Sequence, residues 1–118
     1  MDNMIQKTAF REAFGDSPRV KVWDFLLDNA GLDWSKSDMA EQTGISRATL
    51  NRFFDDIVKQ KLIFKTRTIG RATLYMLNRQ LPLVQKLLDL DFVLTGNAFE
   101  KEFGTRKAKK KLKVAAVA

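Results

Sequence analysis

Four polar side chains between positions 47 and 52 have the types and spacing that suit contact with base edges. An Arg can pair with guanine O6 and N7, and an Asn can pair with adenine N6 and N7. If such residues follow one another on a helix, they can meet neighbouring base pairs in a DNA major groove. Together with the residues that flank them, the candidate contacts are Ser46, Arg47, Ala48, Thr49, Asn51 and Arg52.

The residues before this set predict the turn that would position it. Ala40 is small enough for two helices to approach closely, and Gly44 can take the positive φ that closes a tight turn. Ile45 and Leu50 are spaced to point inward, and Ser46 is placed to cap the following helix. Residues 36–57 therefore predict a helix-turn-helix whose second helix enters the groove. The alternative is a pair of core helices that contact no DNA.

The second helix is expected to run from about residue 47 to residue 59. At 100° per residue, its apolar residues fall on one side and should face the core. This core-facing set is Leu50, Phe53, Phe54 and Ile57. Phosphates would repel Asp55 and Asp56, so we place this acidic pair one turn beyond the groove. We expect Asp56 to pair with Lys59 or Arg52 on the helix surface instead.

The helix before the turn supplies a smaller set of candidates. Ser35 and Asp38, three residues apart, resemble a capping box, and this helix should end near Thr43. Its first residues would face the DNA backbone beside the second helix. The candidate contacts are Ser35, Lys36 and Ser37.

Two segments rich in Ile, Phe, Thr, Leu and Tyr, 62–68 and 72–77, predict a β-hairpin. Gly70 in the connection permits a left-handed turn residue, and residues 32–34 form a separate short extended segment. No acidic residue lies between Asp56 and Asp89, which suits a polyanion. Such a hairpin either grips phosphates and the minor groove as a wing or only closes the core. The candidate contacts are Lys65, Arg67, Thr68, Gly70 and Arg71.

The flanking helices carry more apolar surface than one small domain can cover. A helix over 3–14 ends at Gly15, and Ser17-Pro18 opens a second helix that is apolar nearly all round. The last helix opens at Pro82 and runs to Leu94, where Gly96-Asn97 either breaks it or lets 98–103 continue it. Large exposed apolar patches are rare on monomers, so we expect these helices to form a dimer. The expected interface is Ile5, Phe10, Phe14, Leu83, Leu87, Leu90 and Leu94.

The predicted fold is therefore mostly α with a small β-hairpin, divided into four segments. Residues 1–15 are an N-terminal helix and candidate dimer arm, and residues 16–79 are the DNA-binding unit. Residues 80–103 are a C-terminal dimerisation helix. Residues 104–118 form a basic tail, which we expect to be disordered without a partner.

The composition excludes several kinds of chemistry. The 118 residues include no Cys and no His, which removes disulfides, thiolate or imidazole metal sites, and Cys or His nucleophiles. The adjacent acids Asp55 and Asp56 are a weak basis for a metal-dependent nuclease, so we expect no enzyme, no metal and no cofactor. The net charge of +7 combines −2 over residues 1–60 with +9 over residues 61–118. Without a long apolar stretch or a secretory leader, we expect a cytoplasmic, nucleoid-associated protein.

The order of helix, helix-turn-helix, hairpin and apolar helix resembles the small archaeal winged helix-turn-helix transcriptional regulators over about residues 14–94. The resemblance rests on FGDSPRVKVWDFLLDN, SKSDMAEQTGISRATL and TRTIGRATLYMLN. The middle segment also resembles the DNA-reading part of MarR and ArsR-type repressors. The resemblance implies dimeric binding to operator DNA. The ArsR metal site does not carry over, since Cys and His are absent, and the MarR ligand pocket has no recognisable residues here, so a small-molecule effector stays open.

Residues and resemblance together predict a homodimer that binds double-stranded DNA in a sequence-specific way and regulates transcription. One rival is an architectural or DNA-segregation protein of low specificity, which the basic tail favours. A second rival is a winged-helix module for protein–protein assembly, which the acid-free hairpin disfavours. No membrane partner is expected.

Overall fold

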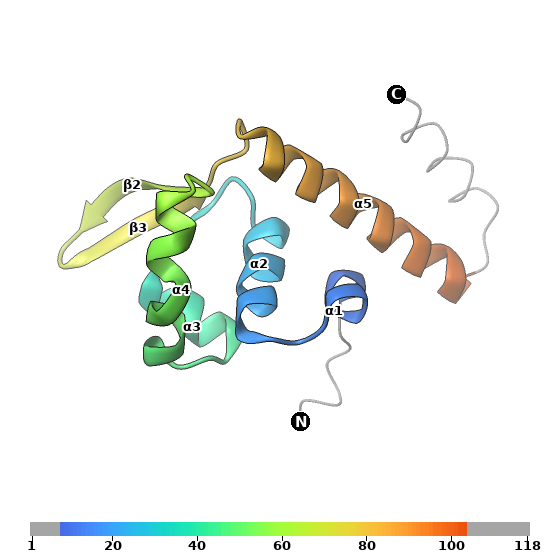
Figure 1. Cartoon of the computed structure of the whole chain (residues 1–118), viewed down its shortest axis with the longest axis horizontal. Helices are drawn as coiled ribbons and strands as arrows, with labels where there is room; N and C mark the ends of the chain where they lie inside the picture. Colours follow the sequence, from blue (N-terminus) through green and yellow to red (C-terminus); the bar gives the residue numbers. More distant parts are fainter. Residues whose placement is uncertain (1–7, 104–118) are drawn as a thin grey trace.

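The computed structural model describes the backbone of residues 8–103 and the side chains of residues 8–97. Helices gather beside a small antiparallel sheet, and the long helix α5 runs past α2 and α1 (Figure 1). In chain order the elements are α1 (Ala9–Phe14), α2 (Pro18–Asp28), β1 (Asp33–Ser35), α3 (Lys36–Thr43), α4 (Arg47–Lys59), β2 (Ile63–Ile69), β3 (Ala72–Leu77) and α5 (Pro82–Phe103). This order confirms the predicted fold, mostly helical with a hairpin.

Local capping rules account for the starts of the central helices. The Oγ atoms of Ser17, Ser35 and Ser46 each accept a hydrogen bond from the backbone N–H three residues on. In α3 the cap is reciprocal, because the Asp38 carboxylate accepts from the Ser35 N–H. Gly44 follows α3 with a φ of 77°, the left-handed conformation that reverses the chain toward α4. The predicted helix-turn-helix is confirmed.

The hairpin belongs to a three-stranded antiparallel sheet in the order β1-β3-β2. Trp34 of β1 pairs with Tyr75 of β3, and Phe64 of β2 pairs with Met76. The sequence indicated only a short extended segment at 32–34. It becomes a strand because the outer edge of β3 would otherwise leave a row of unpaired backbone groups.

One core joins the helices to the sheet. The four residues predicted to face inward from α4 are each at most 7% exposed, which confirms that side of the helix. Phe10 of α1 and Val84 of α5 are also buried, so both terminal helices are fastened to the body of the protomer. The remaining buried hydrophobic residues are Val22, Leu26, Leu27, Met39, Ala40, Leu62, Ile63, Leu74 and Leu77.

Helix α5 is continuous, so Gly96-Asn97 does not break it. Its 22 residues span about 33 Å at 1.5 Å per residue. Within residues 8–103, no helix combines the length and apolar character needed to cross a bilayer. The predicted helix start at Asn3, the expected interface residue Ile5 and the basic tail 104–118 lie outside the described residues.

Candidate nucleic-acid interface

The outward side of α4 presents the candidate base contacts. We call Arg47, Ala48, Thr49, Asn51 and Arg52 the recognition face. Four of these residues are exposed and Thr49 is half-buried. The Thr49 hydroxyl accepts from the hydroxyl of the capping Ser46 at 2.9 Å, so the helix cap already uses it. Among the described residues Arg52 has no hydrogen bond or ion pair, and its guanidinium is available for a base or a phosphate.

Two hydrogen bonds connect the start of α3 to α4 and fix two cations beside the recognition face. Lys36 Nζ donates to Asn51 Oδ1 at 3.2 Å and lies 4.6 Å from the centre of the Phe54 ring. A guanidinium nitrogen of Arg47 donates to Ser37 Oγ at 2.6 Å. The Asn51 amide oxygen has a second lone pair for the N6 amine of adenine, and the hydrogen bond from Lys36 orients the amide beside the groove.

A cleft of about 420 Å³ opens between the starts of α3 and α4 and the hairpin. Three cationic side chains from three elements, Lys36, Arg47 and Arg71, line it together. Hydroxyl groups complete the polar lining, which includes Ser35, Ser37, Thr73 and Tyr75. Cations and hydroxyls in one concave site are suited to hold a DNA phosphate and so set the register of a neighbouring helix. The three candidates predicted from the helix before the turn all line this cleft.

The hairpin departs from a regular ladder at the position where it could contact DNA. It turns at Gly70-Arg71, and Gly70 has a φ of 60°. The pairing shifts register between Lys65 and Arg67, which leaves Thr66 as the extra residue of a β-bulge. Adjacent residues of a regular strand point to opposite faces. The bulge relaxes that alternation and lets Thr66 and Arg67 reach the same partner.

That partner is Asp33 of β1, on the far side of β3. Thr66 Oγ1 donates to Asp33 Oδ2 at 2.6 Å, and the Arg67 guanidinium donates to the two carboxylate oxygens at 2.9 and 3.2 Å. These hydrogen bonds, chiefly those from Arg67, hold the pKa of Asp33 below its usual value. Arg67, expected as a wing contact with DNA, is therefore held by the sheet. Arg71 remains the wing arginine without an ion pair among the described residues.

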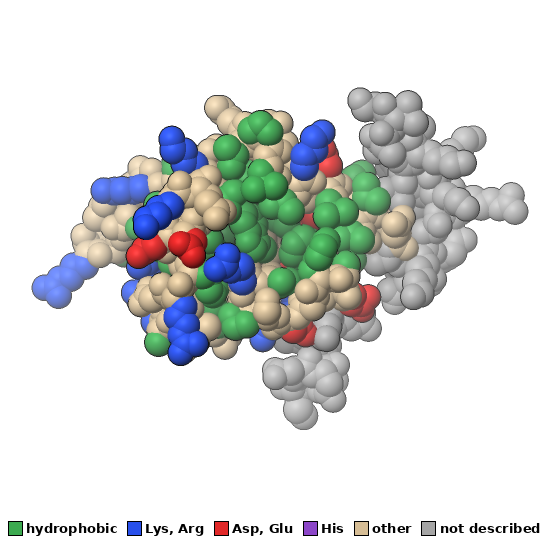
Figure 2. Space-filling model, viewed as in Figure 1, with side chains coloured by type: hydrophobic (Ala, Val, Ile, Leu, Met, Phe, Trp, Pro, Cys, Tyr) green, Lys and Arg blue, Asp and Glu red, His purple; other side chains and the backbone are tan. Residues whose placement is uncertain are grey.

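Charge and apolar surface are separated on the molecule. Lys and Arg side chains gather over the hairpin and α4, while hydrophobic side chains spread toward α5 (Figure 2). Asp55 and Asp56 are exposed on α4. The predicted partner of Asp56 was wrong: its carboxylate lies 3.9 Å from Arg19 of α2, whose guanidinium is drawn there by stacking over a ring of α4. Asp56 thus faces α2 and forms no ion pair with the recognition face.

Comparison with known proteins decides the fold. No protein-family model and no curated protein matches the chain. Solved structures do match it. NadR in complex with 4-hydroxyphenylacetate is 18% identical, with 92% of this chain and 77% of NadR covered and a TM-score of 0.57. A Lactococcus lactis ZitR mutant in complex with DNA is 17% identical, with 82% and 68% covered and a TM-score of 0.53. The adhesin competence repressor AdcR from Streptococcus pyogenes is 15% identical, with 98% and 81% covered and a TM-score of 0.50.

The fold is a winged helix-turn-helix. The helices α3 and α4 are its helix pair, the β2–β3 hairpin is its wing, and β1 completes the sheet. Helices α1 and α5 flank the motif and pack against each other. This arrangement places the recognition face, the cleft and the wing on one winged-helix unit, with the terminal helices beside it.

The terminal helices of this winged helix-turn-helix keep part of their apolar stripe exposed. At 100° per residue, Leu83, Leu87, Leu90 and Leu94 fall on one flank of α5. Leu83 and Leu90 are exposed, whereas Leu87 and Leu94 are half-buried against the protomer's own core. At the end of α1, Phe14 is 52% exposed. We call these five residues the terminal apolar surface.

The structure does not leave Phe10 available for the expected dimer interface. Phe10 is only 4% exposed, and its ring lies 4.9 Å from that of Phe14 within the same protomer. The sequence showed both residues on one stripe and could not show that α1 packs against α5. Phe10 is therefore a core residue of its own protomer. Of the two phenylalanines, only Phe14 is exposed to a second copy.

Sequence reasoning missed the contacts in the interface that join residues far apart in the chain. Asp33 and Arg67 are 34 positions apart, and Lys36 and Asn51 are 15 apart. No local pattern links such residues, since each pair forms only when separate elements pack. One signal was available for the wing, namely that Asp33 is an acid in a short segment expected to be extended.

Proposed function

We propose that this chain is a homodimeric transcriptional regulator that binds specific double-stranded DNA. The observation that carries the proposal is the joint position of the recognition face and the cleft lined by Lys36, Arg47 and Arg71. With a phosphate held in the cleft, α4 lies along the major groove and the wing reaches the neighbouring backbone or minor groove. No enzymatic step and no small-molecule effector is part of the proposal.

Each residue set has a distinct role in this proposal. Asn51 and Arg52 contact base edges, because they are exposed one turn into α4. Lys36 and Arg47 contact the backbone from the cleft, and Arg71 contacts it from the wing. The remaining backbone candidates are Ser35, Ser37, Ser46, Ala48, Thr49, Lys65, Thr68 and Gly70. Arg67 acts indirectly, by holding the wing to β1.

Two of the similar structures belong to proteins whose DNA complex or repressor function supports this role. The ZitR structure is a complex with DNA, and AdcR is named as a repressor. A regulator of this kind would work in the cytoplasm at the nucleoid, where a dimer on a promoter blocks or assists the basal machinery. The rival architectural function differs in specificity, and the rival assembly function differs in needing no DNA.

Selection of bound fragments from a random DNA pool tests the function directly. A regulator should recover an inverted repeat with half-sites about 34–36 Å apart. It should also prefer that site over random DNA by roughly a thousandfold or more across a salt titration. A small ratio would favour the architectural rival. Failure to bind any duplex at about 50 mM salt would refute the DNA-binding proposal and favour the assembly module.

The homodimer is proposed from the terminal apolar surface, with residues 16–79 as the DNA-binding unit and the flanking segments 1–15 and 80–103 as the dimerisation elements. Sedimentation equilibrium at micromolar concentration should give twice the chain mass of 13.5 kDa. Leu83→Glu combined with Leu90→Glu should give a monomer, because two charges then face the two-fold axis. Leu32→Glu is the control, since Leu32 is more exposed than either of these leucines but lies before β1. A wild-type monomer, both alone and on DNA, would refute the dimer.

A further inference from the structure

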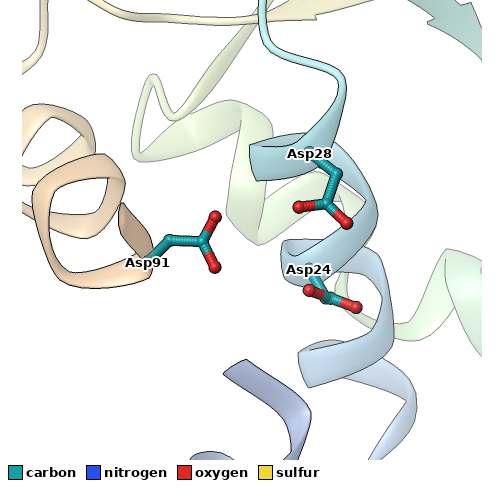
Figure 3. A group of neighbouring side chains, drawn as sticks. All are labelled: Asp24, Asp28 and Asp91. Atoms are coloured by element: carbon teal, nitrogen blue, oxygen red, sulfur yellow. The ribbon is translucent and has the colours of Figure 1, made fainter. Parts of the chain in front are cut away.

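Three aspartates from two helices bring their carboxylates together between α2 and α5. Asp24 and Asp28 lie one turn apart on α2, and the side chain of Asp91 projects from α5 toward them (Figure 3). One oxygen from each residue lies within 4.8 Å of the others. Asp24 is only 6% exposed, Asp91 is half-buried and Asp28 is exposed. The cluster therefore has a buried floor and one side that is open to water.

The described part of the chain provides no counter-charge that binds this cluster. None of the described Lys or Arg residues forms a salt bridge with the three aspartates. Arg11, whose charge acts on Asp24, donates to Asp16 at 2.5 Å. Like charges at this separation repel strongly when water is excluded. The packing of α5 on α2 thus brings three acids together without an internal ion pair.

One atom of the cluster points more directly to a ligand. Oδ1 of Asp24 is buried and has no hydrogen-bond partner. Thr8 supplies a hydrogen bond to the Asp24 side chain, yet this oxygen stays unpaired. Buried polar atoms in folded proteins are nearly always paired with protein, water or an ion. An unpaired carboxylate oxygen in a group of three carboxylates favours a positive ligand over a neutral one.

We propose that Asp24, Asp28 and Asp91 bind a hard divalent cation of the Mg²⁺ or Mn²⁺ class. All three protein donors are carboxylate oxygens, which these ions prefer, and the chain has no His or Cys to favour softer metals. A hollow of about 140 Å³ borders Asp24 and Asp28 but not Asp91, so water can reach the cluster from the α2 side. Arg11 and Lys21 also line this hollow and are the rival sources of positive charge.

This proposal departs from an expectation based on the sequence. We expected no metal because Cys and His are absent and only the adjacent pair Asp55-Asp56 stood out among the acids. Asp24 and Asp28 are spaced four residues apart on a helix that was expected to be buried, which is a signal for a shared partner. Asp91 joins them only through the tertiary packing of α5. The cation would tie α5 to α2, and its binding does not depend on the proposed DNA-binding function.

Mn²⁺ alone is the probe for this site. The full chain is treated with EDTA, desalted at pH 7.5 and titrated with Mn²⁺, while electron paramagnetic resonance follows the free aquo ion. We expect about one bound ion per chain, which excess Mg²⁺ displaces. Asp28→Asn and Asp91→Asn should each weaken binding on the order of tenfold or more. Asp89→Asn, an exposed change of the same charge on the same helix, should bind like the wild type.

A second measurement separates loss of the site from loss of the fold. In EDTA, Asp28→Asn and Asp91→Asn should unfold at or above the wild-type temperature, because each removes repulsion. Mn²⁺ should raise the unfolding temperature of the wild type and of Asp89→Asn only. Absence of bound Mn²⁺ at about 1 mM free ion would overturn the proposal. Equal binding by the wild type and both cluster variants would overturn it as well. If the wild type binds no Mn²⁺ and Lys21→Gln lowers the unfolding temperature, the counter-charge of the cluster is Lys21 instead.

Discussion

The wing offers a sharp test of the DNA interface because its two arginines differ in one respect. Arg71 has no ion pair among the described residues, whereas Arg67 is bound by both oxygens of Asp33. On duplex DNA, each phosphate neutralised adds about 0.9 to the slope of log K against log salt. Arg71→Ala should therefore reduce the slope by about 0.9. The Arg67–Asp33 pair has no net charge and should contribute little to the slope.

Replacing Asp33 and replacing Arg67 should have opposite effects on DNA binding. Asp33→Asn should release Arg67 and increase the slope by up to about 0.9. Over a fourfold change in salt, this difference amounts to about 3.5-fold in the loss of affinity. Arg67→Ala should weaken binding to all sequences, because it leaves the Asp33 carboxylate without a counter-charge in the wing sheet. Asp33→Asn in the Arg67→Ala background should restore most of that loss, so the two changes will not be additive.

Fluorescence anisotropy at four salt concentrations measures these slopes with a selected duplex and a random duplex. Lys86→Ala is the matched control, since it removes one exposed cation from α5 rather than from the wing. Equal reductions of the slope by Arg67→Ala and Arg71→Ala would refute the reasoning. An unchanged slope in Asp33→Asn would show that Arg67 does not depend on Asp33 when DNA is bound.

Three further variants test the recognition face, the turn and the acidic cluster. Arg52→Ala should weaken binding to the selected site by about 1–3 kcal/mol and relax the preference at one base pair, which repeated fragment selection measures; unchanged preference would contradict its role. Gly44→Ala should lower the free energy of unfolding in urea by about 1–2 kcal/mol, because φ is 77° although nothing lies within 4 Å of the added Cβ. Burial and then the charges of Asp24 and Asp91 raise the pKa of Asp28 from 3.8 to about 6. Between these two pKa values, the folded protein holds a proton that the unfolded chain has lost. In EDTA, the free energy of unfolding should therefore fall as the pH rises from 3.8 to about 6. Asp28→Asn should make this decline less steep.

The local part of this fold could be predicted because its causes lie within a few residues of sequence. Ser17, Ser35 and Ser46 each bond a backbone group three residues on, and Gly44 needs only its own positive φ. The inward side of α4 follows from helical periodicity alone. These rules were sufficient to place the recognition face on one side of a correctly bounded helix.

The rest depends on contacts between distant elements. The bulge at Thr66 and the pairing of Arg67 with Asp33 exist only once β1 and β2 flank β3. The same is true of Phe10, which is buried because α1 packs on α5, and of Asp91, which meets α2. Periodicity shows which face of a helix is apolar, but it cannot show whether another element of the same chain covers that face.

Strand β1 is three residues long, and each of its residues holds a different part of the protein. Asp33 is bound by Arg67 of the wing, the Trp34 ring packs edge-on against Phe25 of α2 at 4.9 Å, and Ser35 caps α3. Through these neighbours β1 connects the wing, α2 and the helix pair. Because α5 packs on α1 and α2, a signal that enters through α5 should reach the wing by way of β1 and move the wing together with the helix pair on the DNA.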